Sequence, residues 1–203
     1  MSAKVTIIDY NIGNIQSVAK AIEFLGAKIS WAKTPEDVMA AEKIIMPGVS
    51  AFGAAVKNLK SANLDLAIKE KISKGTLFLG ICVGYQILFE RSEETPDISG
   101  LGILKGSCVK FKNPELIVPH MGWNNVKQLK KSRYFKNIDD NAFFYFVHSY
   151  FPEPSEKSIK LCLTDYEETF CSAVEFENIT ATQFHPEKSQ KNGLKFLENF
   201  LKD

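Results

Sequence analysis

The feature that most constrains this chain is the alternation of short apolar runs with helical patterns through roughly its first 90 residues. Runs typical of buried strands occupy Lys4–Asp9, Ala27–Ala32, Lys43–Met46 and Thr76–Ile81. Between these runs, apolar residues recur every three or four positions, as they do on the buried face of a helix. This repetition predicts a parallel sheet with helices packed on its faces.

Turn and capping residues mark where these elements begin and end. A helix is expected from Asn14 to Leu25, and Thr34 followed by Pro35 has the pattern of a helix N-cap and first turn. Pro47–Gly48 is expected to end the third strand. The segment Val83–Arg91 is expected to form the helix that follows the fourth strand.

The second half of the chain carries mostly strand patterns. The expected strands are Leu101–Phe111, Asn124–Leu129, Ala142–Tyr150, Ile159–Thr164, Ser172–Phe176 and Ile179–Phe184. Helical spacing returns only over Gln190–Lys202, and no repeat or linker divides the chain. We therefore expect one α/β domain over residues 1–203, with a mostly parallel central sheet flanked by helices and an antiparallel extension in its second half.

Charge and hydropathy argue against two broad classes of protein, although a local basic patch stays compatible with the overall charge. Lys and Arg number 25 against 24 Asp and Glu, a net charge of +1, whereas a nucleic-acid binder usually shows a basic excess. No apolar run reaches the length of about 18 residues that a membrane span needs. The N-terminal run meets a charge at Lys4 and has no signal-peptide pattern. We expect a cytoplasmic protein that binds neither nucleic acid nor membrane.

The cysteines and histidines show no metal-binding pattern. The cysteines are Cys82, Cys108, Cys162 and Cys171, and the histidines are His120, His148 and His185. None of the cysteines forms a Cys-x-x-Cys pair, and the histidines lack short ligand spacing. We expect no metal site and no cofactor, and we interpret three of the cysteines as small buried apolar side chains. Cys82 differs because of its neighbours.

Cys82 stands at the centre of Gly80-Ile81-Cys82-Val83-Gly84, between an apolar strand and a helical pattern. This is the spacing of a nucleophile elbow, with Cys in place of Ser. A tight strand-to-helix turn exposes the central side chain and leaves room only for glycine two residues to either side. The start of the following helix favours a thiolate, and the Val83 N–H would face a developing oxyanion.

A matching base lies near the other end of the chain, in Gln183-Phe184-His185-Pro186-Glu187. Residues two apart in an extended segment project to the same side, so the Glu187 carboxylate can bond one ring nitrogen of His185. That bond fixes the tautomer and leaves the other nitrogen for the thiol. The end of the third strand, at Gly48, offers further amide donors, although a plain Pro-Gly turn explains it equally well.

Together these motifs resemble the triad class of glutamine amidotransferases. Longer strings resemble one family within it, the glutaminase subunits of imidazole glycerol phosphate synthases. These strings are Asp9–Asn14, Pro119–Asn124, Phe146–Tyr150 and His185–Gln190. The likeness extends over residues 4–201, and Pro-His-Met-Gly-Trp-Asn is the most particular of the strings.

The resemblance implies a role for each matching position. Cys82 would be the nucleophile on L-glutamine, His185 the general base and acid, and Glu187 its orienting group. Oxyanion donors would come from Gly48, Val49 and Val83. Glutamine would be held by Gln86, Glu94, Ser149 and Tyr150, and a partner would dock on Trp123, Asn124, Tyr145 and Lys188. The implied partner is a (β/α)8-barrel cyclase, which would receive ammonia before water protonates it.

Two positions depart from the family pattern: Ser50 replaces a usual glycine after Val49, and Tyr85 replaces a usual methionine. Neither change removes a catalytic group. Three alternatives keep some of these features: a related glutaminase that feeds a sugar-amidinating enzyme, a stand-alone cysteine hydrolase, and a non-catalytic docking module. The stand-alone hydrolase does not explain Pro119–Asn124, and the intact Cys82, His185 and Glu187 argue against the docking module.

Overall fold

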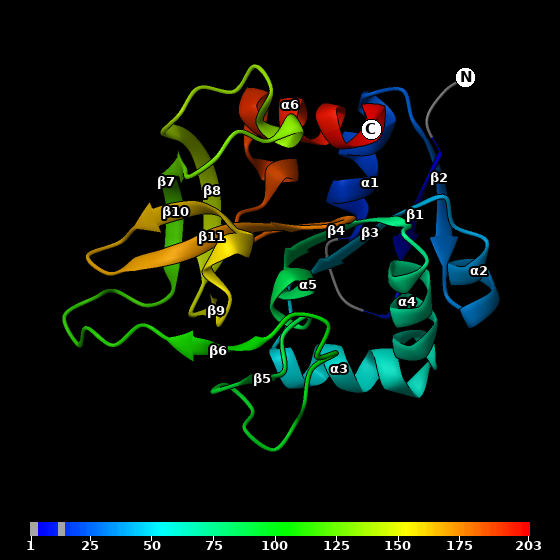
Figure 1. Cartoon of the computed structure of the whole chain (residues 1–203), viewed down its shortest axis with the longest axis horizontal. Coiled ribbons are helices and arrows are strands. Elements are labelled where there is room, and N and C mark those ends of the chain that lie inside the picture. The colour runs from blue at the N-terminus through cyan, green and yellow to red at the C-terminus, as the bar shows by residue number, and fades with distance from the viewer. Residues whose placement is uncertain (1–3, 12–14) are drawn as a thin grey trace.

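A nine-stranded mixed sheet forms the centre of the computed structural model, which describes residues 4–11 and 15–203 (Figure 1). Its strands lie in the order β2-β1-β3-β4-β12-β11-β10-β7-β8. The first five are parallel and the last four antiparallel to their neighbours. A second sheet, in the order β5-β6-β9, packs beside it. The predicted mostly parallel sheet with an antiparallel extension is confirmed.

The elements of the first half follow the expected rhythm. In chain order they are β1 (Lys4–Ile8), α1 (Ile15–Phe24), β2 (Lys28–Ala32), α2 (Pro35–Met39), β3 (Lys43–Gly48), α3 (Phe52–Ser61), α4 (Leu64–Ser73), β4 (Leu77–Cys82) and α5 (Val83–Gln86). Thr34 caps α2 in a complete capping box with Asp37. The predicted helix start at Asn14 lies outside the described residues.

The second half is built mainly from strands. They are β5 (Arg91–Ser92), β6 (Gly106–Lys110), β7 (His120–Gln128), β8 (Ala142–His148), β9 (Tyr150–Pro154), β10 (Lys160–Asp165), β11 (Thr169–Phe176) and β12 (Ile179–Thr182). Three 3-10 turns lie among them: η1 (Arg133–Phe135), η2 (Lys157–Ile159) and η3 (Pro186–Lys188). Helix α6 covers Gln190–Lys202, with the bounds that the sequence predicts.

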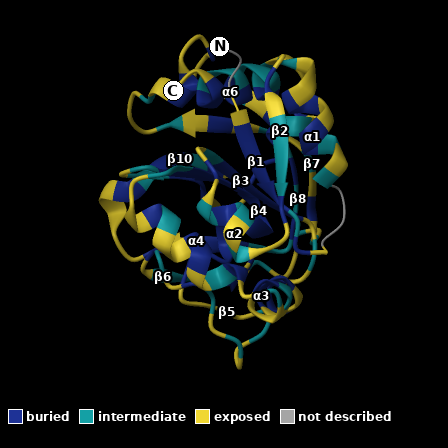
Figure 2. Cartoon of the chain, turned by 90° about the vertical axis from the view of Figure 1, so that its right-hand side faces the viewer, coloured by how far each residue is buried: buried dark blue, intermediate teal, exposed yellow. Residues whose placement is uncertain are grey.

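Helices cover both faces of the parallel part of the sheet. Figure 1 shows α1 and α6 on one side and α3, α4 and α5 on the other. Strands β1, β3 and β4 between them are almost wholly buried, as the dark blue ribbons of Figure 2 show. Within residues 4–11 and 15–203, no helix has the length and apolar character that crossing a membrane requires.

Several predicted boundaries are wrong. Strand β7 begins at His120 rather than Asn124, β11 begins at Thr169 rather than Ser172, and β12 ends at Thr182 rather than Phe184. Strand β3 does not end before Pro47 but continues through Gly48, which pairs with Cys82 of β4. Its other neighbour, β1, pairs with it only as far as Ile45. Pro47 therefore lies where β3 has a neighbour on one side only, and its missing N–H is tolerated.

The expected helix over Val83–Arg91 is a single turn, α5. The carbonyls that would continue it are taken by another segment, since the amides of Leu101 and Ile103 donate to Ile87 and Leu88 at 2.8 and 2.9 Å. For the same reason, the predicted strand over Leu101–Phe111 is shortened to β6. The long-range hydrogen bonds replace the local ones.

The single strand expected over Ala142–Tyr150 is in fact two. β8 ends at His148 in the large sheet, and β9 begins at Tyr150 in the small one. Pro152 and Pro154 obscure β9 in the sequence, but the structure places it at an edge, where proline is tolerated. This change of sheet brings Ser149 to the wall of the cavity described next.

Candidate active site

Three parallel strands end side by side and bring together residues far apart in the sequence. Gly48 at the end of β3 is in register with Cys82 at the end of β4. On the other side of β4, Thr182 of β12 pairs with Ile81, and the chain then runs through Gln183 to His185. Because the carboxyl ends of parallel strands share one edge, this edge gathers the predicted nucleophile and base.

Cys82 occupies a strained backbone conformation, with φ 54° and ψ −109°. The two glycines of the elbow are required by close approach. A Cβ on Gly84 would lie 1.8 Å from the Met46 carbonyl oxygen, and one on Gly80 would lie 2.7 Å from the Gly84 oxygen. The predicted steric reason for the Gly-x-Cys-x-Gly spacing is thus present in the structure. Strain of this kind is typical of functional sites.

The thiol of Cys82 is nearly buried, with 3% of the residue exposed. The side-chain amide of Gln183 donates to Sγ at 3.6 Å, and Sγ lies 4.0 Å from the Val147 carbonyl oxygen. Gln183 had no predicted role. Its position within the Gln-Phe-His-Pro-Glu string was the only available signal.

His185 and Glu187 are joined by a 2.8 Å hydrogen bond between Nδ1 and Oε1. Their side chains are only 1% and 2% exposed. The predicted contact is present, but the local backbone conformation differs from the expected one. Residues Pro186–Lys188 form the 3-10 turn η3 rather than an extended segment. The backbone N–H of His185 donates to the Tyr145 carbonyl at 2.9 Å, which ties the turn to β8.

Two atoms of this pair, His185 Nε2 and Glu187 Oε2, have no hydrogen-bond partner among the described residues. Burial opposes protonation of His185, but the neighbouring Cys82 and Glu187 outweigh it and raise the pKa of the imidazole above its ordinary value. With Nδ1 held by Glu187, Nε2 is the nitrogen left to exchange a proton with Cys82. This is the arrangement of a base that serves a thiol nucleophile.

A cavity of about 410 Å³ opens beside these groups. Of the predicted site residues, it is lined by Cys82, His185, Val49, Val83, Gln86, Glu94, Ser149, Tyr150 and Lys188, and also by Ser50, Val147 and His148. A volume of this size accommodates a small molecule. The structure therefore gathers the predicted nucleophile, base and substrate-binding residues around one space.

Two side chains of the cavity are fixed by other bonds. Gln86 donates to the Tyr150 carbonyl at 2.8 Å and to Gln183 Oε1 at 3.1 Å. Glu94 Oε2 accepts the backbone N–H of Phe52 at the start of α3, at 2.7 Å. Each of these bonds leaves another polar atom of the same side chain for a ligand.

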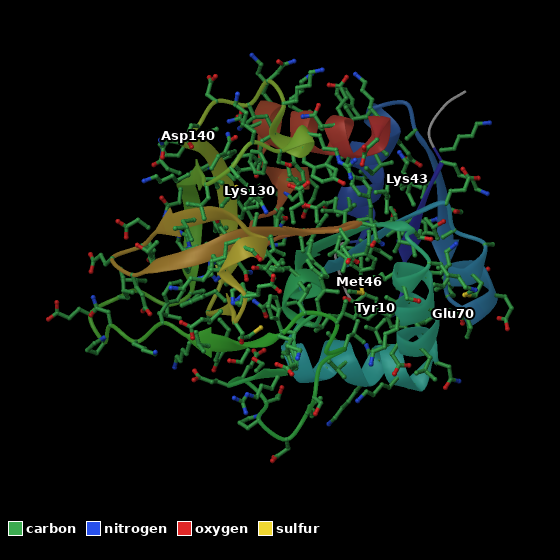
Figure 3. The ribbon with its side chains drawn as sticks, viewed as in Figure 1. Tyr10, Lys43, Met46, Glu70, Lys130 and Asp140 are labelled. Carbon is green, nitrogen blue, oxygen red and sulfur yellow. The ribbon has the colours of Figure 1, made fainter. Side chains whose placement is uncertain are left out.

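Gly48 lies behind the cavity under close contact. A Cβ there would be 2.8 Å from the Tyr10 hydroxyl and 2.9 Å from Cβ of Val83. The same hydroxyl donates to the Pro47 carbonyl at 2.6 Å. Tyr10, which Figure 3 labels close to Met46, thus holds the end of β3. Sequence reasoning missed it, because 37 residues separate the two partners.

The two departures from the family pattern differ in position. Ser50 lines the cavity, and its hydroxyl donates to the Ala51 carbonyl at 3.3 Å. Tyr85 is fully buried away from the cavity, where its hydroxyl contacts Cys171 Sγ at 3.4 Å. Cys108, Cys162 and Cys171 are all buried, as predicted. Among the described residues, no cluster of His, Cys, Asp and Glu is arranged to bind a metal ion.

The four residues expected to meet a partner are divided between two faces of β7 and β8. Trp123 is 46% exposed and packs edge-on to Tyr145, with 6.1 Å between ring centroids. Lys188 lies over the Tyr145 ring at 5.8 Å. Asn124 points to the opposite side of the strand, where its half-buried amide bonds to His120 and to the Asp165 carbonyl. A role in docking remains a prediction for all four.

Comparison with known proteins shows which family the chain matches. The family model described as "Glutamine amidotransferase class-I" matches residues 6–203. The chain is 50% identical over 195 residues to the imidazole glycerol phosphate synthase subunit HisH of Methanocaldococcus jannaschii, covering 96% of this chain and 97% of that one. It is 46% identical over 200 residues to subunit HisH 1 of Methanococcus maripaludis, with 97% and 98% covered.

Solved structures share the fold at lower identity. A crystal structure of a glutamine amidotransferase superimposes with a TM-score of 0.75 at 16% identity, covering 96% of this chain and 98% of that one. The structure of PurLQS from Thermotoga maritima gives a TM-score of 0.75 at 18% identity, covering 100% and 99%. These likenesses concern the fold alone.

Proposed function

The chain belongs to the class-I glutamine amidotransferases, among the HisH subunits of imidazole glycerol phosphate synthase, and from this membership we propose that it hydrolyses L-glutamine and passes the ammonia to a cyclase subunit in histidine biosynthesis. The observation that carries the proposal is that Cys82 and His185 line one cavity, with Glu187 bonded to His185. The whole chain, 1–203, acts as one amidotransferase domain in the cytoplasm.

The first half of the reaction forms a thioester. Nε2 of His185 takes the thiol proton as Sγ of Cys82 bonds to the side-chain amide carbon of glutamine, and the carbonyl electron pair moves to oxygen. Amide donors from Val83 and from the Gly48–Val49 peptide stabilise this oxyanion. When the carbonyl re-forms, the C–N bond breaks, and His185 returns its proton to the departing ammonia.

The second half restores the thiol. A water molecule gives a proton to His185 Nε2 as its oxygen bonds to the thioester carbon. The C–S bond then breaks, Sγ recovers the proton, and glutamate leaves. Glu187 accepts from Nδ1 throughout, so it keeps Nε2 directed at the thiol and stabilises the protonated ring.

The cavity walls are suited to hold an amino acid. The backbone at Ser149 and Tyr150 binds the α-carboxylate, and Gln86 and Glu94 bind the polar groups of glutamine, as the family resemblance implies. The Glu94 carboxylate, whose Oε2 is bonded to Phe52, presents its other oxygen to the α-ammonium group.

The exposed face around Trp123, Tyr145 and Lys188 is the proposed docking face. It carries exposed apolar side chains, with Met121 62% and Phe143 52% exposed, and apolar patches of this kind mark interaction surfaces. Lys188 belongs to this face and also lines the cavity. Docking there places the partner directly over the point at which ammonia forms, so ammonia leaves unprotonated.

The test uses a diazo-ketone analogue of glutamine, with the labelled residue identified by mass spectrometry. We expect labelling of Cys82 and of none of the other three cysteines. In the complex with the cyclase, Cys82→Ala should abolish synthesis from glutamine but retain synthesis from added ammonia. Labelling of Cys108, Cys162 or Cys171 with Cys82 untouched would overturn the proposal.

The partner is tested by glutamine hydrolysis with and without the cyclase. Adding the cyclase with its ligand should raise the rate about a hundredfold or more, a barrier change of at least about 2.7 kcal/mol. Trp123→Ala should weaken association by about 2 kcal/mol, because interface aromatics often carry much of the binding energy. Its circular dichroism should stay unchanged. Fast hydrolysis by the isolated chain, indifferent to the cyclase, would favour a stand-alone hydrolase.

A further inference from the structure

A line of hydrogen bonds runs from strand β7 to the wall of the cavity through two buried histidines. Nδ2 of Asn124 lies 3.2 Å from His120 Nε2, His120 Nδ1 lies 3.0 Å from His148 Nε2, and His148 Nδ1 lies 3.0 Å from the Tyr150 carbonyl oxygen. His120 and His148 are only 3% and 5% exposed. The proposed reaction gives neither histidine a role.

The two ends of this line fix the direction of every bond in it. The Tyr150 carbonyl can only accept, so Nδ1 of His148 carries the proton, and the amide nitrogen of Asn124 can only donate. Each neutral ring therefore donates from Nδ1 and accepts at Nε2. Protonation of either ring would place two N–H groups face to face.

Aromatic rings enclose the pair and keep it neutral. His120 is stacked between Tyr166 and Phe146, with ring centroids at 4.0 and 4.9 Å, and Phe170 packs against His148 at 5.0 Å. Burial in this setting lowers the pKa of His120 to about 4 and that of His148 to about 3. The geometry and the electrostatics thus agree on one pair of tautomers.

The far end of the line bears directly on the glutamine pocket. The Tyr150 carbonyl accepts from His148 and also from Gln86, at 3.0 and 2.8 Å. With two donors on one oxygen, the Tyr150 peptide cannot rotate without breaking both bonds. The residues just before this peptide, Val147 to Ser149, line the cavity.

We propose that His148 and His120 are positioning residues for glutamine, which fix the Ser149–Tyr150 wall of the pocket from Asn124 on β7. The inference rests on the proposed function and extends it. Asn124 is suited to this role because it lies beside Trp123 in the chain but on the opposite face of the strand. Its amide also donates to the Asp165 carbonyl at 2.9 Å, which fixes the orientation of the side chain.

The experiment measures the rate at which the diazo-ketone analogue labels Cys82 in the isolated full chain, as a function of analogue concentration. The half-saturating concentration reports binding, and the limiting rate reports the chemistry of the thiol. We expect His148→Leu to raise the half-saturating concentration about tenfold, the effect of losing one buried hydrogen bond. The limiting rate should change by less than about twofold.

Two further variants separate positioning from general damage. His148→Asn keeps an N–H donor near Nδ1, so it should restore most of the lost binding. Asn124→Asp replaces the donor to His120 with a carboxylate and should raise the half-saturating concentration by about threefold or more. Its matched control is Asn125→Asp, the same change on the next residue, whose exposed amide donates to the Asn141 carbonyl. That control should leave both parameters unchanged.

If His148→Leu fails to fold, the comparison of Asn124→Asp with Asn125→Asp decides. Equal half-saturating concentrations in those two variants would overturn the inference alone, as would binding unchanged in a folded His148→Leu. Failure of the unmodified chain to be labelled at Cys82, both alone and in the cyclase complex, would overturn the proposed function, and this inference with it.

Discussion

Two pairs of buried side chains contribute to the cavity, and they differ in whether their polar atoms are satisfied. In the His185–Glu187 pair, Nε2 of the histidine and Oε2 of the glutamate have no hydrogen-bond partner within residues 4–11 and 15–203. In the His120–His148 pair, every ring nitrogen has one. Buried polar atoms without partners are rare and demand an explanation. Here the His185–Glu187 pair, with its unpaired atoms, faces the thiol and is suited to exchange a proton. The fully hydrogen-bonded His120–His148 pair is suited to hold the pocket wall in position.

The charge states of the two pairs differ in the same way. Glu187 and Cys82 raise the pKa of His185, whereas burial among aromatic rings lowers the pKa of both His120 and His148. Neighbouring Cys82 and Glu187 thus make one imidazole a proton acceptor, whereas burial keeps the other two neutral. Substitutions and acid can test this contrast, starting with the largest expected effect.

The contrast is tested most strongly by His185→Asn. Removing His185 Nε2 should lower glutamine hydrolysis in the cyclase complex by about a thousandfold or more. The catalytic residues act as one unit, so the loss of one removes the rate enhancement of all. Synthesis from added ammonia in the same complex is the control and should persist. Loss of less than about tenfold would show that His185 is not the base.

The second prediction concerns Glu187→Gln, which keeps an oxygen for Nδ1 but removes the charge. Because the imidazole remains, hydrolysis should fall by about tenfold to a hundredfold, less than for His185→Asn. The pKa of His185 should move down, and the pH profile of kcat/KM should show it. Glu23→Gln, an exposed change on α1, serves as the matched control. Full activity and an unmoved profile in the Glu187→Gln variant would exclude the assigned role.

The two pairs also differ in how far sequence could predict them. The His185–Glu187 contact and the Cys82 elbow were predicted, because each lies within five consecutive residues. Only the local conformation at His185 was wrong, since a two-residue spacing is compatible with either a strand or a 3-10 turn. The Cys82 elbow meets the His185–Glu187 pair because β4 and β12 are parallel neighbours in the sheet. The strand–helix rhythm of the sequence predicts a parallel β4, but it does not indicate that β12 is parallel.

The His120–His148 pair had no such local signal. Both residues lie in strings that carried the family resemblance, but their contact depends on the register of β7 against β8, in which His120 pairs with His148. Tyr10 and Gln183 were missed for the same reason, since their partners are 37 and 101 residues away. Local spacing predicts chemistry within a turn, whereas strand register decides which distant polar groups meet.

The third prediction uses acid to sharpen the contrast. The unfolded chain protonates its histidines near pH 6.5, but folded His120 and His148 resist protonation down to about pH 4 and about pH 3. Between these limits the unfolded state binds more protons, so the free energy of unfolding falls as the pH falls. His185, with its raised pKa, has the opposite sign and loses its contribution only on the alkaline side.

Each of the two histidines loses about 2 kcal/mol of its contribution between pH 7 and pH 5, and His185 regains a smaller part. We therefore expect the unfolding free energy to drop by about 3 kcal/mol over this range, measured by urea denaturation. In the double variant His120→Leu/His148→Leu, this slope should be largely absent. An equal acid slope in the unmodified and double-variant proteins would show that the pair is not held neutral by the fold.

The smallest expected effect is the coupling free energy between His120 and His148. It tests whether the hydrogen bond between the two rings stabilises the folded protein. In His148→Leu, the Nδ1–H of His120 loses its acceptor within an aromatic enclosure, and an unsatisfied buried donor costs more than a missing pair. In the double variant, neither partner remains to be left unsatisfied. The double variant should therefore be less destabilised than the sum of the single variants, by about 1 kcal/mol, measured by urea denaturation at pH 7. Additivity to within about 0.3 kcal/mol would mean that the 3.0 Å bond between the rings contributes nothing to stability. In that case the aromatic enclosure, and not the bond between the rings, would keep His120 and His148 neutral.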